Sequence, residues 1–190
     1  MIAGLLNKNN KERIILYSSD MWYFAAGMLG PLFAVFAEKV GGDVFDISWA
    51  YATYLIVTGV LIIVVGKISD IFNNKEKLLV LGYFLNTIFT FSYLFVSTPI
   101  HLFIVEAGLG LASALAWPTG DALYAKCEDE NKDGYEWGLF TGGEFIVGGL
   151  GLIVGGLIVS HFSFKFLFIV MGSIQLIATI YQARILINKK

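Results

Sequence analysis

The sequence predicts an all-α membrane protein, a bundle of six transmembrane helices. Hydrophobic residues make up 57% of the 190 residues and charged residues 15%, whereas soluble domains carry roughly 25% charged residues. Six stretches are also long enough to cross a bilayer, which requires about 20 mostly apolar residues per helix. Helices are favoured over barrel strands because runs such as Leu61–Val65 do not alternate between apolar and polar residues.

The six predicted spans cover residues 14–37, 47–66, 78–98, 99–125, 138–160 and 162–187. The first span is longer than the apolar core of a signal peptide, which has about 7–15 residues, and no small-residue cleavage site follows it. We therefore expect the first span to remain in the bundle as a helix. All six spans are expected to form a single domain over residues 1–190.

Lys and Arg are distributed unevenly between the two sides of the predicted membrane. Of the 13 Lys and Arg residues, all but Lys39 and Lys165 fall on the side that holds both termini. Cytoplasmic loops collect these residue types. We therefore expect both termini to be cytoplasmic and the protein to lie in the plasma or inner membrane. A net charge of −2 gives no reason to expect a nucleic-acid partner.

The two halves of the chain share sequence features, as the inverted repeats of transporters do. Asp20 precedes Pro31 by eleven residues in the first span, and Glu106 precedes Pro118 by twelve in the fourth. The second and fifth spans share a Trp-x-x-x-Thr motif followed by two glycines. The pattern predicts a 3+3 inverted repeat over residues 14–98 and 99–187, with a late kink in both proline-containing spans.

The loop between the second and third spans resembles a known family signature. Residues 66–75 read Gly-Lys-Ile-Ser-Asp-Ile-Phe-Asn-Asn-Lys, similar to the G-x-L-S-D-R-x-G-R-[RK] loop of the major facilitator superfamily. Gly66, Asp70 and Lys75 match it, together with the serine. Ile71 replaces the usual arginine, and two asparagines replace Gly-Arg. Asparagine tolerates a positive φ, so the turn can survive although part of the basic cluster is lost.

The fourth and fifth spans add to this resemblance. Gly108-x-Gly110, Trp117-Pro118 and the glycine-rich run 148–156 look like helices four and five of the same superfamily. Leucine stands where antiporters of the family carry proline, which weakens an antiporter assignment. The resemblance covers essentially the whole of this chain. The chain corresponds to only one of the two six-helix bundles of a typical member, as in short bacterial members of the family.

This resemblance implies a carrier of a small solute, with its substrate cavity between two bundles. It also implies a gating role for the loop residues Gly66, Asp70 and Lys75. Alternating access needs a second bundle, and a second copy of the chain would supply one by two-fold symmetry. We therefore expect a homodimer. A separate six-helix partner and a non-transporting membrane interaction protein remain alternatives.

Small-residue pairs allow helices to approach closely. The fifth span contains Gly138-x-x-x-Gly142 and Gly151-x-x-x-Gly155. These pairs could pack helices within one bundle or between two copies, and the sequence leaves both open.

Three carboxylates fall inside the predicted spans: Asp20, Glu106 and Glu144. A charged residue at the centre of a span costs about 2.5–3.5 kcal/mol on insertion scales, so such residues mark substrate paths and proton relays. None of the three has a Lys or Arg within one helical turn in sequence. We predict that they bind substrate or couple transport to protons. The alternatives are a water-facing helix end for Asp20 and an outward-reaching side chain for Glu106.

Three further residues are weaker candidates for lining a cavity. Asn86 and Gln175 lie well inside the third and sixth spans, where their amides could instead bond to neighbouring helices. Trp117, in the fourth span, could form part of a cavity wall.

No enzyme, metal or cofactor is predicted. The chain contains no His-Glu-x-x-His, Gly-x-Ser-x-Gly or Walker motif, and its single cysteine, Cys127, excludes a disulfide framework. Asp129-x-Asn131-x-Asp133-Gly134 resembles the start of a calcium-binding loop. The twelfth position of such a loop must be a bidentate Glu, and here it is Phe140.

Overall fold

The computed structural model describes residues 10–71, 74–127 and 133–187, with no side chain described for residue 133. Every regular element in these ranges is a helix, as the sequence predicts. The helices are α2 (Asn10–Gly27), α3 (Leu32–Lys39), α4 (Val44–Ile71), α5 (Lys75–Ser92), α6 (Pro99–Tyr124), α7 (Asp133–His161) and α8 (Phe164–Ala183). Two 3₁₀ turns, η1 (Tyr93–Phe95) and η2 (Arg184–Leu186), extend α5 and α8.

Five of the described helices are long and apolar enough to cross a membrane: α4, α5 with η1, α6, α7 and α8. The pair α2 and α3 passes the same test together but is bent by 50°. The protein is therefore a multi-pass membrane protein, with a sixth crossing if the bent pair forms one span. The prediction of an all-α membrane bundle is confirmed.

The two proline-containing spans behave differently. Pro31 follows a break between α2 and α3, where the proline lacks an N–H and disfavours helix at the residue before it. In contrast, α6 continues unbroken through Pro118, where the sequence predicts a kink. Pro118 leaves the carbonyl of Ala114 without its backbone donor, and the hydroxyl of the next residue, Thr119, donates to a different carbonyl, that of Leu115, at 2.6 Å.

α4 and α7 extend beyond their predicted apolar spans, because polar residues continue each helix past the apolar stretch. The backbone N–H of Asp46 donates to Asp43 Oδ1 at 2.9 Å, and the N–H of Asp43 donates to Asp46 Oδ2 at 3.1 Å. This reciprocal pair satisfies two amides that the start of α4 would otherwise leave unbonded.

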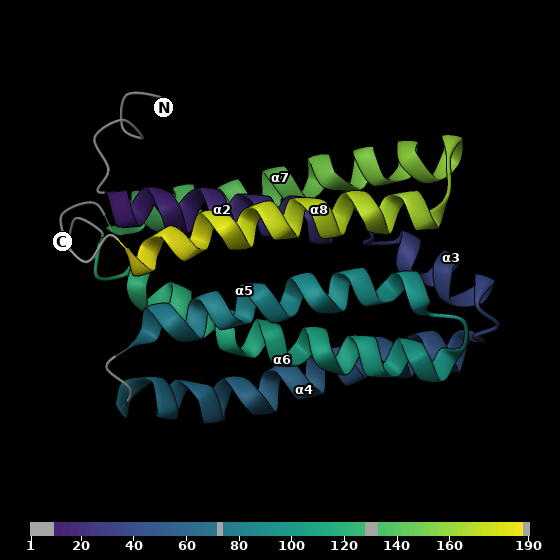
Figure 1. Ribbon diagram of the computed structural model, residues 1–190, viewed down its shortest axis with the longest axis horizontal. Helices are drawn as coiled ribbons and strands as arrows, with labels where there is room; N and C mark the ends of the chain where they lie inside the picture. The colour runs from purple at the N-terminus through teal and green to yellow at the C-terminus, as the bar shows by residue number, and fades with distance from the viewer. Residues whose placement is uncertain (1–9, 72–73, 128–132, 188–190) are drawn as a thin grey trace.

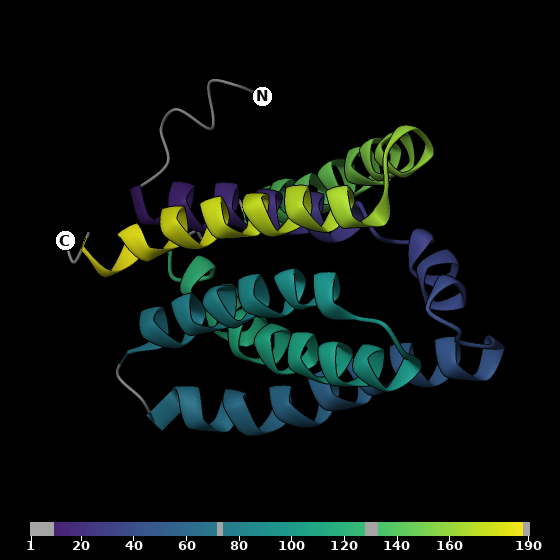
Figure 2. The same cartoon turned by 45° about the vertical axis from the view of Figure 1, so that its right-hand side comes forward.

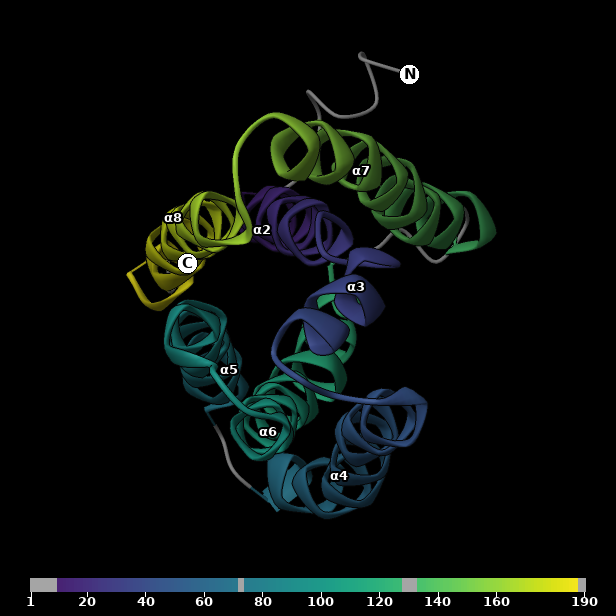
Figure 3. The same ribbon diagram turned by 90° about the vertical axis from the view of Figure 1, so that its right-hand side faces the viewer.

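The helices lie side by side along one direction, with the start of α2 and the end of α8 at the same end of the bundle (Figure 1). α2 packs against α7 and α8, α6 packs against α4 and α5, and the α5–α8 contact joins the two groups. α3 lies between the groups at the other end (Figure 2). Viewed end-on, α4 and α7 lie at opposite extremes of the arrangement (Figure 3).

The principal helix contacts are symmetric between the two halves of the chain. Exchanging α2, α4 and α5 with α6, α7 and α8 converts the α2–α7 contact into α6–α4 and the α2–α8 contact into α6–α5, while α5–α8 maps onto itself. The predicted 3+3 inverted repeat would give such a symmetric pattern, and it stays a prediction.

The α2–α7 contact depends on glycines. A Cβ atom at Gly155 would lie 1.9 Å from the carbonyl oxygen of Met28, and one at Gly151 would lie 2.2 Å from that of Phe24. The Gly151–Gly155 pair therefore packs helices within the bundle. Gly138 and Gly142 have no described atom within 4 Å of an added Cβ, so this pair stays open.

Candidate functional site

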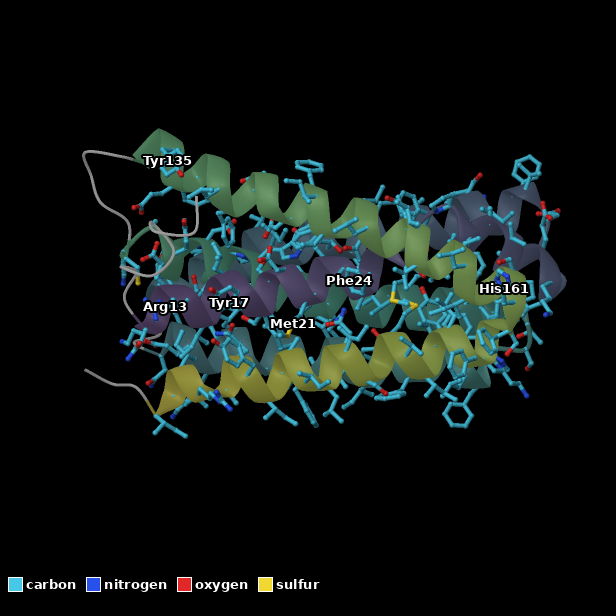
Figure 4. The ribbon with its side chains drawn as sticks, turned by 90° about the horizontal axis from the view of Figure 1, so that it is seen from above. Arg13, Tyr17, Met21, Phe24, Tyr135 and His161 are labelled. Atoms are coloured by element: carbon cyan, nitrogen blue, oxygen red, sulfur yellow. The ribbon has the colours of Figure 1, made fainter. Side chains whose placement is uncertain are left out.

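Among the described residues, one cavity lies in each half of the bundle's length. The Glu144 cavity, about 200 Å³, lies between α2, α5, α6 and α7 near the end where α2 begins. The Glu106 cavity, about 260 Å³, lies among α2, α4, α5, α6 and α8 toward the other end. Figure 4 shows the direction of α2, from Arg13 past Tyr17 and Met21 to Phe24, with His161 of α7 at the far end. Trp22 lines both cavities and is only 5% exposed.

The Glu144 cavity holds two acidic residues. Ser19 Oγ on α2 donates a hydrogen bond to Glu144 Oε1 on α7 at 2.5 Å. Asp121 on α6 lines the same cavity, and so does Trp117, whose buried Nε1 has no hydrogen-bond partner among the described residues. No Lys, Arg or His of the described chain lines this cavity. The carboxylates therefore have no counter-cation in the cavity wall.

Asp20 lies next to this cavity but is not part of its wall. Its Oδ1 atom would be 3.1 Å from a Cβ at Gly143, the residue before Glu144. The absence of a side chain at Gly143 thus leaves room for the Asp20 carboxylate against α7. Asp20 is half-buried, so both the role in transport and the alternative of a water-facing helix end stay open.

Glu106 lies in the other cavity and is 4% exposed. The hydroxyl of Tyr93, in η1, donates a hydrogen bond to Glu106 Oε1. Glu106 therefore faces the interior of the bundle, and the alternative that it reaches outward is wrong. No basic residue of the described chain lines this cavity either.

Asn86 and Gln175 both line the Glu106 cavity and are buried. Gln175 Nε2 donates to the carbonyl oxygen of Trp22 at 3.2 Å, which fixes the orientation of its amide. Its Oε1 atom and the Nδ2 atom of Asn86 have no partner among the residues that the structure describes. Their amides are thus only partly used in helix packing.

The signature loop lies at the end where α2 begins, between α4 and α5. Lys75 Nζ is 3.0 Å from Asp70 Oδ1, and Asp70 is exposed. Ser69 Oγ donates to the carbonyl of Gly66 at 2.8 Å. Two loop residues, 72 and 73, lie outside the described ranges.

The predicted site residues thus separate into three places. Glu144 and Trp117 share one cavity with Asp20 beside it; Glu106, Asn86 and Gln175 share the other; and Gly66, Asp70 and Lys75 are in the loop. Sequence reasoning missed Tyr93 as the partner of Glu106. Tyr93 lies 13 residues before Glu106 in an apolar run, and no local pattern distinguishes it from an interface aromatic.

The acidic loop after α6, with Asp129 and Asn131, lies outside the described residues. Within the described ranges, no group of three or more His, Cys, Asp or Glu side chains could hold a metal ion. Burial raises the pKa of the Cys127 thiol, which lies beyond the end of α6, and the nearby Glu12 carboxylate adds to this shift.

Comparison with known proteins places the chain in a family. Residues 21–189 match the Major Facilitator Superfamily. A relative named as an uncharacterized MFS-type transporter, from Methanocaldococcus jannaschii, is 27% identical over 177 residues, which is 93% of this chain and 45% of the relative. The chain therefore spans about half the length of the curated relative it matches. With a match over most of its residues, this chain belongs to the Major Facilitator Superfamily.

Proposed function

We propose that this chain forms one half of a secondary active transporter that moves a small solute across a membrane. The observation that carries the proposal is the placement of carboxylates without counter-cations in two cavities of an apolar helix bundle. Ionisable residues inside membrane helices are costly and typically mark substrate or ion pathways. Family membership supports a carrier rather than an enzyme.

We further propose that a second copy of the chain covers the side of the bundle between α4 and α7. In the apolar stretches of α4 and α7, only 17% and 11% of the residues are buried inside the bundle. The corresponding shares in α5, α6 and α8 are 39–50%. Both cavities also have an exposed wall residue on this side, Tyr51 on α4 and Thr141 on α7. A polar cavity mouth is poorly matched to lipid, and a facing bundle would cover it.

The length of the relative supports this arrangement. Because the chain spans 45% of that transporter, the relative has enough additional length for a second bundle of similar size. Two copies related by two-fold symmetry would reproduce such a pair.

Orientation follows from the charge distribution. Lys39 and Lys165 both belong to the end opposite the start of α2, where Lys39 Nζ lies 5.5 Å from the ring centre of Phe164. The other Lys and Arg residues are predicted on the side that holds both termini. We propose that this side is cytoplasmic and that the membrane is the plasma or inner membrane. The Asp70–Lys75 pair would then contribute to a cytoplasmic gate.

Native mass spectrometry of the protein in lipid nanodiscs tests the oligomeric state. We expect a particle with twice the chain mass of 20.9 kDa. A strict monomer would contradict the homodimer and would favour a separate six-helix partner. A stable dimer that moves no solute would favour the alternative of a membrane interaction protein.

Proton coupling is tested in proteoliposomes that contain a pH-sensitive dye. We expect a transported solute to change the internal pH, and D20N, E106Q or E144Q to reduce this change. Substituting Ser160, an exposed residue at the far end of α7, by Ala provides a control. Solute flux with the same pH dependence in the unmodified protein and all three variants would reject coupling through these carboxylates.

A further inference from the structure

The Glu106 cavity combines three kinds of group that the proposed transport function does not by itself explain. A buried carboxylate, two buried amide side chains and five aromatic rings line a space of about 260 Å³, and one polar atom of each amide has no partner among the described residues. These groups come from helices α2, α3, α4, α5, α6 and α8 and from the 3₁₀ turn η1. Their chemistry defines what the cavity can bind.

The aromatic rings form much of the wall. They belong to Trp22, Phe33, Tyr51, Tyr54 and Tyr93. The ring centres of Tyr51 and Tyr54 are 6.2 Å apart with stacked planes, and those of Phe33 and Tyr51 are 6.3 Å apart. The faces of aromatic rings attract cations, particularly where water is excluded.

The carboxyl group of Glu106 provides a charge partner for such a cation. The Tyr93 hydroxyl that donates a hydrogen bond to Glu106 is an uncharged group, so it supplies no positive charge. No Lys, Arg or His among the described residues lines the cavity. A buried carboxylate is stabilised by a cation in hydrogen-bond contact, and here the cation can be brought by a ligand.

The two amides add directional groups. Because Gln175 Nε2 is held by the Trp22 carbonyl, its Oε1 is left as an acceptor. Asn86 Nδ2 is left as a donor, and both residues are at least 95% buried. Unpartnered buried polar atoms destabilise a fold, so their presence in a cavity wall points to a bound partner.

We propose that the Glu106 cavity binds a small organic cation, a protonated amine with a second hydrogen-bonding group. The ammonium would donate to Glu106 within the aromatic wall, and the second group would bond to Asn86 or Gln175. A cavity of about 260 Å³ is just below the usual range of small-molecule sites, roughly 300–1,000 Å³, which suits a single-ring amine. This inference rests on the proposed transport function, for which it names the substrate class.

Binding of three matched probes to the protein in phosphatidylcholine nanodiscs tests the proposal. Tyramine is a cation, tyrosol is its neutral alcohol and 4-hydroxyphenylacetate is its anion; titration calorimetry with empty nanodiscs corrects for partition into lipid. We expect tyramine to bind at least about tenfold more tightly than tyrosol, and the anion to bind most weakly. Equal binding of tyramine and tyrosol, or no binding of tyramine, would overturn the proposal.

Glu106→Gln is the central variant, because the amide keeps the shape and still accepts from Tyr93. We expect it to weaken tyramine binding about ten- to hundredfold, the range for losing one hydrogen bond to a charged group. Ser160→Ala, at an exposed position near the far end of α7, is the control and should leave tyramine binding unchanged. Equal affinities of E106Q and the unmodified protein would exclude Glu106 as the cation site.

Asn86→Leu tests the amides in a variant that is expected to fold. Because Asn86 Nδ2 is buried without a described partner, replacing this side chain by an apolar group of similar shape should keep or raise the melting temperature. We expect the same change to remove the preference for tyramine over phenethylamine, which lacks the phenol hydroxyl. An unchanged preference in both N86L and Q175L would contradict the role of the amides.

Binding and transport can fail separately. Tyramine binding that depends on Glu106, without solute flux in proteoliposomes, would support the site and reject the transport function. Flux of a solute by a protein that does not bind tyramine would support transport and reject this site.

Discussion

At the scale of single residues, the polar groups inside the bundle bond mostly to distant parts of the chain. The hydroxyls of Thr87 on α5 and Thr179 on α8 are 2.8 Å apart, and Thr179 also donates to the carbonyl of Tyr83 at 2.9 Å. Ser18 of α2 bonds to Gln182 of α8. Because lipid offers no competing hydrogen bonds, such contacts hold one helix against another. At the Glu106 cavity, in contrast, Gln175 Oε1 and Asn86 Nδ2 have no partner among the described residues, and we assign these two atoms to a ligand.

Cys127 offers a pH-dependent test at this scale. The thiolate is the reactive form of cysteine, and burial raises the pKa of this thiol. At neutral pH the folded protein therefore holds less thiolate than the denatured chain, and the difference disappears once the pH exceeds the folded pKa. We expect the pH midpoint of alkylation by N-ethylmaleimide to be higher in nanodiscs than in denaturing detergent. Equal midpoints would contradict the burial of this thiol; a slower rate alone would not be decisive, because partial shielding slows the reaction at every pH.

The sequence predicts which residues belong to a site better than it predicts how they are grouped. Glu106 and Glu144 are identifiable because a carboxylate in an apolar span is costly wherever it lies. Which of the two cavities each carboxylate faces depends on how its helix is rotated about its own axis. The hydrogen bonds from Tyr93 and Ser19 depend on contacts between helices. The periodicity of a single helix that is apolar on almost all sides carries little of this information.

At the scale of elements, α7 has two chemically similar but structurally different faces. Gly155 lies against the backbone of α2, whereas a Cβ at its neighbour Gly156 would have no described atom within 4 Å. The glycine-rich run is thus partly a packing surface and partly an open one. The sequence alone could not separate the two, because both faces show small-residue spacing.

These faces predict opposite effects of the same substitution. Gly155→Ala would place a methyl group 1.9 Å from the carbonyl oxygen of Met28, and overpacking of this kind lowers the free energy of unfolding by about 1–3 kcal/mol. Gly156→Ala should leave the stability unchanged or raise it by up to about 1 kcal/mol, through helix propensity. Thermal unfolding of the two purified variants, followed by the loss of monodisperse protein, provides the comparison. Equal melting temperatures would show that the α2–α7 contact is looser than described.

Helices are predictable from this sequence because long apolar runs can only be helical in a bilayer. The ends of the helices and the breaks within them are harder to predict from the sequence. The break after α2 and the unbroken course of α6 both involve a proline, and the difference lies in the neighbouring residues. Pro31 directly follows Gly30 in the break between α2 and α3, whereas Pro118 lies inside α6 between helical residues.

At the scale of the whole molecule, the principal helix contacts of the two halves are symmetric. We propose that the two halves are inverted repeats, so that α2 and α6 occupy equivalent central positions and α4 and α7 equivalent outer ones. Asp20 on α2 and Glu106 on α6 are then carboxylates on equivalent helices of the two repeats. Asp20 lies beside one cavity and Glu106 lines the other. In an inverted repeat, equivalent helices cross the membrane in opposite directions, so α6 must span the membrane with its two ends on opposite sides.

This arrangement makes a sharp prediction about accessibility. In a background where Cys127 is replaced by Ser, cysteines are introduced singly at two exposed positions, Ala125 after α6 and Ser97 before it. The two positions lie at opposite ends of α6, and only the Ser97 end carries Lys39 and Lys165. Because Lys and Arg accumulate on the cytoplasmic side, we expect a membrane-impermeant maleimide to label S97C in intact cells and A125C only after permeabilisation. Labelling in the reverse order would place both termini outside and would remove the cytoplasmic gate proposed for Asp70 and Lys75. Labelling of both positions in intact cells would show that α6 does not cross the membrane, and the repeat would then have to be abandoned.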